Sequence, residues 1–189
     1  MALHPAEIRG YRELFLTGRQ LVARWPRLAD ALDGTGTEGS LRTAAEAVDG
    51  MVSGLEPLTA QHGLRSRVAA QGSGARLGFV RSVVVDRFLD RNVALRLAVT
   101  DLEHVTTLLA YLARVSDDRG HPELARPSRS WEQRLAAEQK SVREAAVRLG
   151  AEPDAAIEPL DSSLIGRVAH RAGWTLGAVG EWVDRRVSR

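Results

Sequence analysis

The chain has no cysteine, a single lysine and few aromatic residues. Without cysteine it has no disulfide, thiolate-bound zinc, iron–sulfur cluster or cysteine nucleophile. It also lacks an uninterrupted run of about 18 apolar residues, so no segment has the pattern of a transmembrane helix. The first residues, MALHP, are not basic and then apolar as in a signal peptide. We therefore expect a cytoplasmic protein in which any metal ligands are carboxylates and histidines.

The composition is that of an ordinary globular protein: 189 residues, of which 44% are hydrophobic and 26% are charged. The net charge of +2 is unevenly distributed. Residues 61–100 hold seven arginines and two acidic residues, a balance of +5, between two acidic stretches. Such a block could meet phosphate or anionic lipid, but the acidic flanks favour a solvent-exposed arginine face. With few interleaved aromatics and no helix-turn-helix pattern, we do not expect nucleic-acid binding.

Apolar residues recur every three or four positions, which is the spacing of one face of an α-helix. The pattern predicts helices over about 6–33, kinked or split at Pro26, and over about 40–62, bent or ended at Pro57. A long helical zone follows over about 75–119, with a joint at 90–92. A short segment ends at Pro127, and a further helix covers about 128–149.

These segments predict an all-α fold, an antiparallel bundle of four to five main helices over residues 1–160. A C-terminal amphipathic helix over 161–189 would pack on this bundle within a single domain. The part of the long zone that begins at Val93 is apolar around most of its circumference, which predicts a central helix surrounded by the others.

Two carboxylates fall on predicted apolar faces. Asp101 lies beside Leu97 and Leu102, with His104 one turn further on, and Glu138 lies in the stripe of the next helix. Buried carboxylates need a partner or a shifted pKa. One interpretation is therefore a metal site formed by Asp101, His104 and Glu138. The other is a buried polar network. In it, Asp101 or Glu138 would accept a hydrogen bond from an arginine such as Arg134, or from the indole N–H of Trp25 or Trp131.

Asp101-Leu102-Glu103-His104 resembles, with aspartate substituted, the Glu-x-x-His motif of ferritin-like di-iron and di-manganese bundles. This resemblance implies iron or manganese as the ligand, with Glu138 as the facing carboxylate. It covers about a third of the chain, and no second acid-x-x-His motif is present. Glu7, Glu13, Glu46 and Asp49 do not fall cleanly in their apolar stripes. The remaining histidines, His4, His62, His121 and His170, are interpreted as surface or capping residues.

The C-terminal helix carries a seam of glycines beside an apolar stripe. Each interior glycine costs a helix about 1 kcal/mol relative to alanine, so the seam predicts close packing against another helix. Docking on the chain's own bundle, a homo-oligomer or partner interface, and contact with a membrane surface are the three alternatives. The residues concerned are Gly166, Gly173, Gly177, Gly180, Trp174 and Trp182.

Because no complete catalytic set is evident, the leading functional hypothesis is a non-enzymatic accessory or adaptor protein without a cofactor. It would act through protein–protein contacts or self-association. The first alternative is a ferritin-like carboxylate protein that binds iron or manganese. The second is a peripheral membrane-surface protein that uses the tail and the basic block.

Overall fold

A computed structural model of the whole chain describes residues 2–64 and 89–160. This part of the chain contains helices and no strand. The prediction of an all-α helical bundle is confirmed, whereas the predicted C-terminal helix over 161–189 lies outside the described residues. The helices are α1 (Pro5–Ala31), α2 (Glu38–Gln61), α4 (Arg91–Asp118), α5 (Pro122–Leu149) and the short α6 (Pro153–Ala156).

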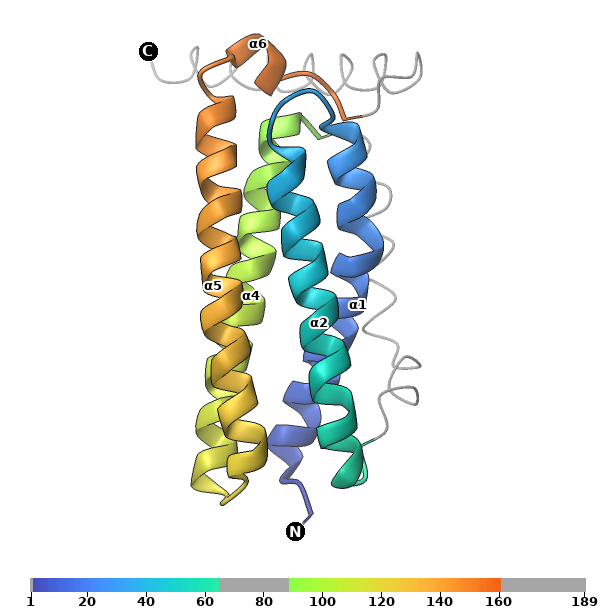
Figure 1. Cartoon of the computed structure of the whole chain (residues 1–189), viewed down its shortest axis with the longest axis vertical. Helices are drawn as coiled ribbons and strands as arrows, with labels where there is room; N and C mark the ends of the chain where they lie inside the picture. Colours follow the sequence, from blue (N-terminus) through green and yellow to red (C-terminus); the bar gives the residue numbers. More distant parts are fainter. Residues whose placement is uncertain (1, 65–88, 161–189) are drawn as a thin grey trace, which may run out of the picture.

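The four long helices lie side by side along the length of the molecule (Figure 1). α1 packs against α2 and α4, and α5 packs against the same two helices, so α1 and α5 lie on opposite corners. Each neighbouring pair is antiparallel, while α2 and α4 run in the same direction. The end of α2 and the start of α4 consequently lie at opposite ends of the bundle. This order of directions is that of four-helix bundles with one long crossover.

The core is apolar along the axis shared by the four helices. Its largest fully buried side chains include Trp25, Tyr11 and Phe15 of α1. α4 contributes a stripe of buried leucines to this core, but Leu97 and Tyr111 on its outer side remain 40% and 49% exposed. The prediction of a surrounded central helix is therefore wrong: α4 occupies one corner of the bundle, and its second apolar face meets solvent.

Three helices continue through a proline. The split predicted at Pro26 and the end predicted at Pro57 are wrong, while the alternative kink and bend stay predictions. α1 continues through Pro26 and α2 continues through Pro57 without being split. α5 begins at Pro122 and includes Pro127, so the predicted separate segment before residue 128 is wrong. A proline inside a helix removes one backbone hydrogen bond. The burial of Leu124, Ala125 and Ser128 around Pro127 shows that packing on the bundle outweighs this loss.

Three chain segments meet at the end of the bundle where α1 begins. His4 caps α1 through a capping box with Glu7. α2 ends there at His62, and α4 turns into α5 through Arg119, Gly120 and His121. Gly120 has a φ of 74°, a left-handed conformation that keeps this turn short. The three histidines at the ends of α1, α2 and α5 are thus brought to one end of the molecule.

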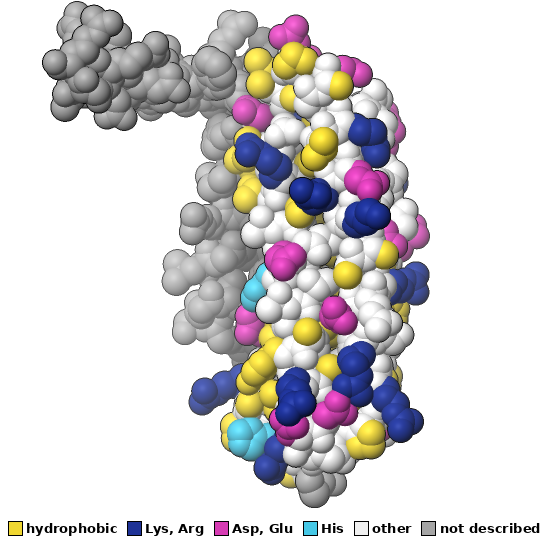
Figure 2. Space-filling model, turned by 90° about the vertical axis from the view of Figure 1, so that its left-hand side faces the viewer, with side chains coloured by type: hydrophobic (Ala, Val, Ile, Leu, Met, Phe, Trp, Pro, Cys, Tyr) yellow, Lys and Arg dark blue, Asp and Glu magenta, His cyan; other side chains and the backbone are white. Residues whose placement is uncertain are grey.

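The surface shows mixed charge. On the face turned toward the viewer in Figure 2, basic and acidic side chains alternate without a large region of one sign. Of the basic stretch 61–100, residues 65–88 lie outside the described residues. No helix in the described part of the chain has the length and apolar character needed to cross a membrane.

Candidate metal centre

Asp101, the first of the predicted metal ligands, lies on α4 with its side chain 31% exposed. Its Oδ2 accepts a hydrogen bond of 2.8 Å from Nη2 of Arg24 on α1. This ion pair matches the alternative interpretation of Asp101 as a member of a polar network, although the arginine is Arg24 and not Arg134. Arg134 instead lies over the ring of Trp131, with its guanidinium 5.2 Å from the ring centroid.

The other two predicted ligands lie on α4 and α5. His104 is 51% exposed, and its Nε2 lies 3.1 Å from Oε1 of Glu13 on α1. Glu138 is partly buried on α5. The binding of a metal by Asp101, His104 and Glu138 stays a prediction. The predicted interface residues of the C-terminal helix, among them Gly173 and Trp174, lie outside the described residues.

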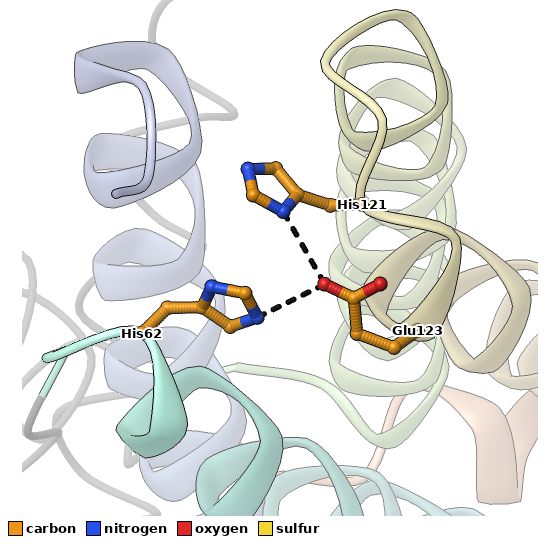
Figure 3. A group of neighbouring side chains, drawn as sticks. All are labelled: His62, His121 and Glu123. Atoms are coloured by element: carbon orange, nitrogen blue, oxygen red, sulfur yellow. Dashed lines mark hydrogen bonds and ion pairs between the residues drawn. The ribbon is translucent and has the colours of Figure 1, made fainter. Parts of the chain in front are cut away.

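A different set of ligand-type side chains converges at the end of the bundle. His62, His121 and Glu123 each offer one ligand atom, and these atoms all lie within 4.8 Å of one another. Nε2 of His62 lies 3.0 Å from Oε1 of Glu123, and Nδ1 of His121 lies 3.2 Å from the same oxygen. Figure 3 shows both rings directed toward this carboxylate.

Helix ends place all three of these side chains. His62 is the C-cap residue of α2, while His121 is the N-cap residue of α5 and Glu123 lies in its first turn. The backbone N–H of His121 donates to the carbonyl oxygen of Ser116 at 2.8 Å, which fixes the turn after α4. The two imidazole rings meet edge to face with centroids 4.9 Å apart. Three helices therefore contribute to the geometry of the group.

Burial decreases across the group, with side-chain exposures of 3% for His121, 12% for His62 and 44% for Glu123. The pKa of the Glu123 carboxyl lies below its usual value, chiefly because its own backbone N–H donates to it and also because His121 donates to it. An ionised carboxylate only accepts hydrogen bonds. A ring nitrogen that donates to this carboxylate carries a proton, and a metal ion would replace that proton.

Behind His121 lies a carboxylate that is fully removed from solvent. Glu7 is 0% exposed, and its Oε1 accepts from Oγ of Ser116 at 2.8 Å. Its Oε2 accepts from the backbone N–H of His4 at 2.8 Å and lies 4.0 Å from Nε2 of His121. That ring nitrogen is buried and has no hydrogen-bond partner among the described residues.

Tyr11 lies one turn beyond Glu7 on α1, and Ser128 lies five residues beyond Glu123 on α5. The Tyr11 hydroxyl and Oγ of Ser128 are 3.1 Å apart in the buried interior. Burial raises the pKa of the Tyr11 phenol, and hydrogen bonding from Ser128 and Ser116 opposes this only in part. The polar cluster thus extends from exposed Glu123 through His121 and Glu7 to Tyr11.

Two of these residues differ from their predicted surroundings. His121 does cap α5, but it is 2% exposed and its side chain makes no capping hydrogen bond. The prediction that Glu7 does not fall cleanly in the apolar stripe of α1 is wrong. Its spacing of four and seven residues from Tyr11 and Leu14 puts it on their face, so this signal was present in the sequence. The approach of His62 to His121 had no such signal, because it depends on which helix ends meet.

The group has the composition of a transition-metal site. Zn²⁺ binds two histidines and one carboxylate in several catalytic sites, and Fe²⁺ binds the same set in non-heme oxygenases. Ligand atoms about 2.0–2.2 Å from a tetrahedral Zn²⁺ lie about 3.3–3.6 Å from one another. The nitrogen–oxygen distances of 3.0 and 3.2 Å are slightly shorter, and all three ligand atoms lie within 4.8 Å of one another, so the side chains would have to adjust to hold the ion.

Comparison with known proteins gives no relative for this chain: no family model, curated protein or solved structure matches it.

Proposed function

We propose that the protein is a helical-bundle metal-binding protein that holds one divalent transition-metal ion, such as Zn²⁺, between His62, His121 and Glu123. The observation that carries the proposal is the convergence of their three ligand atoms within 4.8 Å. Imidazole and carboxylate together suit Zn²⁺ and Fe²⁺ better than Ca²⁺ or Mg²⁺, which prefer oxygen ligands alone.

The place of the group in the fold supports this proposal. His121 is nearly buried and His62 largely so, while Glu123 remains accessible from one side. A site with three protein ligands keeps a coordination position for water or another small ligand, as in catalytic zinc sites. On this reading the bound ion would act as a Lewis acid at the exposed side of the bundle end.

Metal titration of chelator-treated protein tests the proposal. We expect one Co²⁺ or Zn²⁺ ion per chain, measured by calorimetry and by the visible absorption of Co²⁺. The double variant His62→Asn/Glu123→Gln should bind more than about 100-fold more weakly, because it loses two ligands and not merely an outer-shell partner. Both side chains lie at the end of the bundle, so the apo variant should keep the helical circular dichroism of the wild type.

The matched control is Asp101→Ala/Glu138→Ala, which removes two of the ligands predicted from the sequence. This variant should bind the ion as the wild type does. If instead it loses the ion while His62→Asn/Glu123→Gln retains it, the proposed site is wrong and the other set is favoured. A wild-type protein that binds neither ion also overturns the proposal.

A further inference from the structure

The buried carboxylate of Glu7 is hydrogen-bonded but faces one further polar group with which it makes no hydrogen bond. Burial of an ionised carboxylate is costly unless it is paired and hydrogen-bonded. Glu7 receives two hydrogen bonds, from Ser116 and from the backbone of His4, and its third polar neighbour is His121. Nε2 of His121 is likewise a buried polar atom without a hydrogen-bond partner among the described residues. The Glu7 carboxylate and this unpartnered ring nitrogen thus face each other across 4.0 Å.

We infer that Glu7 is a positioning residue for the metal ligand His121, forming a carboxylate–histidine–metal arrangement in which the ion binds Nδ1 and Glu7 accepts from Nε2–H. This inference rests on the proposed function of the same site. Histidines that bind metals usually donate their other ring N–H to a carboxylate or carbonyl, which fixes the tautomer and orients the ring. Nδ1 of His121 already faces Glu123, so only Nε2 is directed toward Glu7.

The tautomer explains why the two groups lie apart without metal. Because Nδ1 donates to the Glu123 carboxylate, a neutral His121 has its lone pair on Nε2. A lone pair does not attract a carboxylate. When an ion replaces the proton on Nδ1, the neutral ring carries its proton on Nε2, directed at Oε2 of Glu7. The 4.0 Å separation is about 1 Å longer than a hydrogen bond and would shorten on metal binding.

Glu7 also connects the site to α1, which supplies none of the three ligands. Its Oε2 accepts a hydrogen bond from the backbone N–H of His4 in the capping box. Its Oε1 accepts a hydrogen bond from the hydroxyl of Ser116 at the end of α4. Glu7 therefore fixes the orientation of His121 relative to two helices that themselves pack together.

The test compares Glu7→Gln with the wild type and with Ser128→Ala. Glutamine keeps an oxygen for the His4 N–H and an amide for Ser116 but loses the charge. We expect the Zn²⁺ dissociation constant of Glu7→Gln to rise about 10- to 100-fold, while the melting temperature of the apo protein is equal to or above that of the wild type. Ser128→Ala removes the buried hydrogen bond to Tyr11 in the same polar cluster and leaves both hydrogen bonds of Glu7 in place. It should bind Zn²⁺ within about threefold of the wild type.

A purely structural role would lower apo stability in Glu7→Gln and leave Zn²⁺ affinity unchanged, and that result overturns the inference. The ring tautomer supplies a second readout. Two-bond ¹H–¹⁵N spectra of the Zn²⁺-loaded wild type should show His121 bound through Nδ1 and protonated on Nε2, and coordination through Nε2 would also overturn it. Failure of the wild type to bind Zn²⁺ is a separate outcome that removes the site itself.

Discussion

At the residue scale, the polar groups at the start of α1 decide what this end of the molecule can do. Glu7 and Tyr11 are both inaccessible to solvent, although the other buried side chains of α1 are apolar. Buried polar networks are stabilising only when their members are hydrogen-bonded. Glu7 and Tyr11 meet this condition through Ser116 and Ser128, whereas the Nε2 atom of His121 does not.

Because of Tyr11, we expect the folded protein to lose stability at alkaline pH. Its pKa is raised in the folded state, chiefly by burial, so folding favours the neutral phenol. The stabilisation is complete below the unfolded pKa of about 10 and is lost as the pH rises toward the folded value. Between these two values the free energy of unfolding should fall by up to about 1.4 kcal/mol per pH unit. Urea unfolding at a series of pH values from 8 to 11 measures this slope.

In Tyr11→Phe this slope should disappear. Near neutral pH the free energy of unfolding of this variant should be about 1 kcal/mol lower than that of the wild type, because the hydrogen bond to Ser128 is lost. Tyr111→Phe is the matched control because Tyr111 is 49% exposed and is the only other tyrosine in the chain. Tyr111→Phe should show the same fall in the free energy of unfolding at alkaline pH as the wild type. An unchanged slope in Tyr11→Phe would show that another group causes it.

At the element scale, the close approach of α1 to α2 depends on Gly18. A Cβ atom added there would lie 2.7 Å from Cγ2 of Val52 and 3.3 Å from Cε of Met51. Val52 and Met51 are buried in the core, and the β-branched valine has little rotamer freedom. The two helices can therefore keep this distance only if residue 18 lacks a side chain.

Gly18→Ala should therefore destabilise the bundle by about 1–3 kcal/mol through overpacking, and about 1 kcal/mol of better helix propensity offsets part of this. Gly39→Ala is the control, because a Cβ atom at this position of α2 meets no described atom within 4 Å. It should raise the free energy of unfolding by about 0.5–1 kcal/mol. Urea unfolding of both variants measures the difference, and equal stabilities would show that the helices separate without cost.

At the scale of the whole molecule, the metal-binding group joins helices that are distant in sequence. His62 ends α2, while His121 and Glu123 begin α5, and Glu7 adds the start of α1. An unfolded chain does not hold these groups together, so an ion that binds them stabilises the folded state alone.

Saturating Zn²⁺ should therefore raise the melting temperature. At a free concentration 100 times the dissociation constant, the stabilisation is about 2.7 kcal/mol, which corresponds to about 5–10 °C for a chain of this size. Differential scanning calorimetry with and without excess chelator measures the shift. The variant His62→Asn/Glu123→Gln should show no shift, and an equal shift in that variant would mean that Zn²⁺ stabilises the protein elsewhere.

The sequence by itself determined the helices and most of their buried faces. Helix formation and the 3.6-residue repeat are local, so the stripe of Leu14, Leu21 and Trp25 could be identified without knowledge of any other segment. The end of α2 at His62 and the turn at Gly120 were equally evident from local signals. The break predicted at Pro127 is wrong because packing of the whole helix outweighs the loss of one backbone hydrogen bond.

Only the tertiary structure decided which helix ends meet and which side chains they bring together. One interpretation of the sequence places a metal site at mid-helix, on Asp101, His104 and Glu138, and that site stays a prediction. Periodicity identifies the face of a helix on which a residue lies, but not which helix ends meet. The ends of α2 and α4 share one end of the bundle because these helices run in the same direction. His62 therefore approaches His121 and Glu123, and Glu7 lies behind them, through contacts that no local pattern could contain.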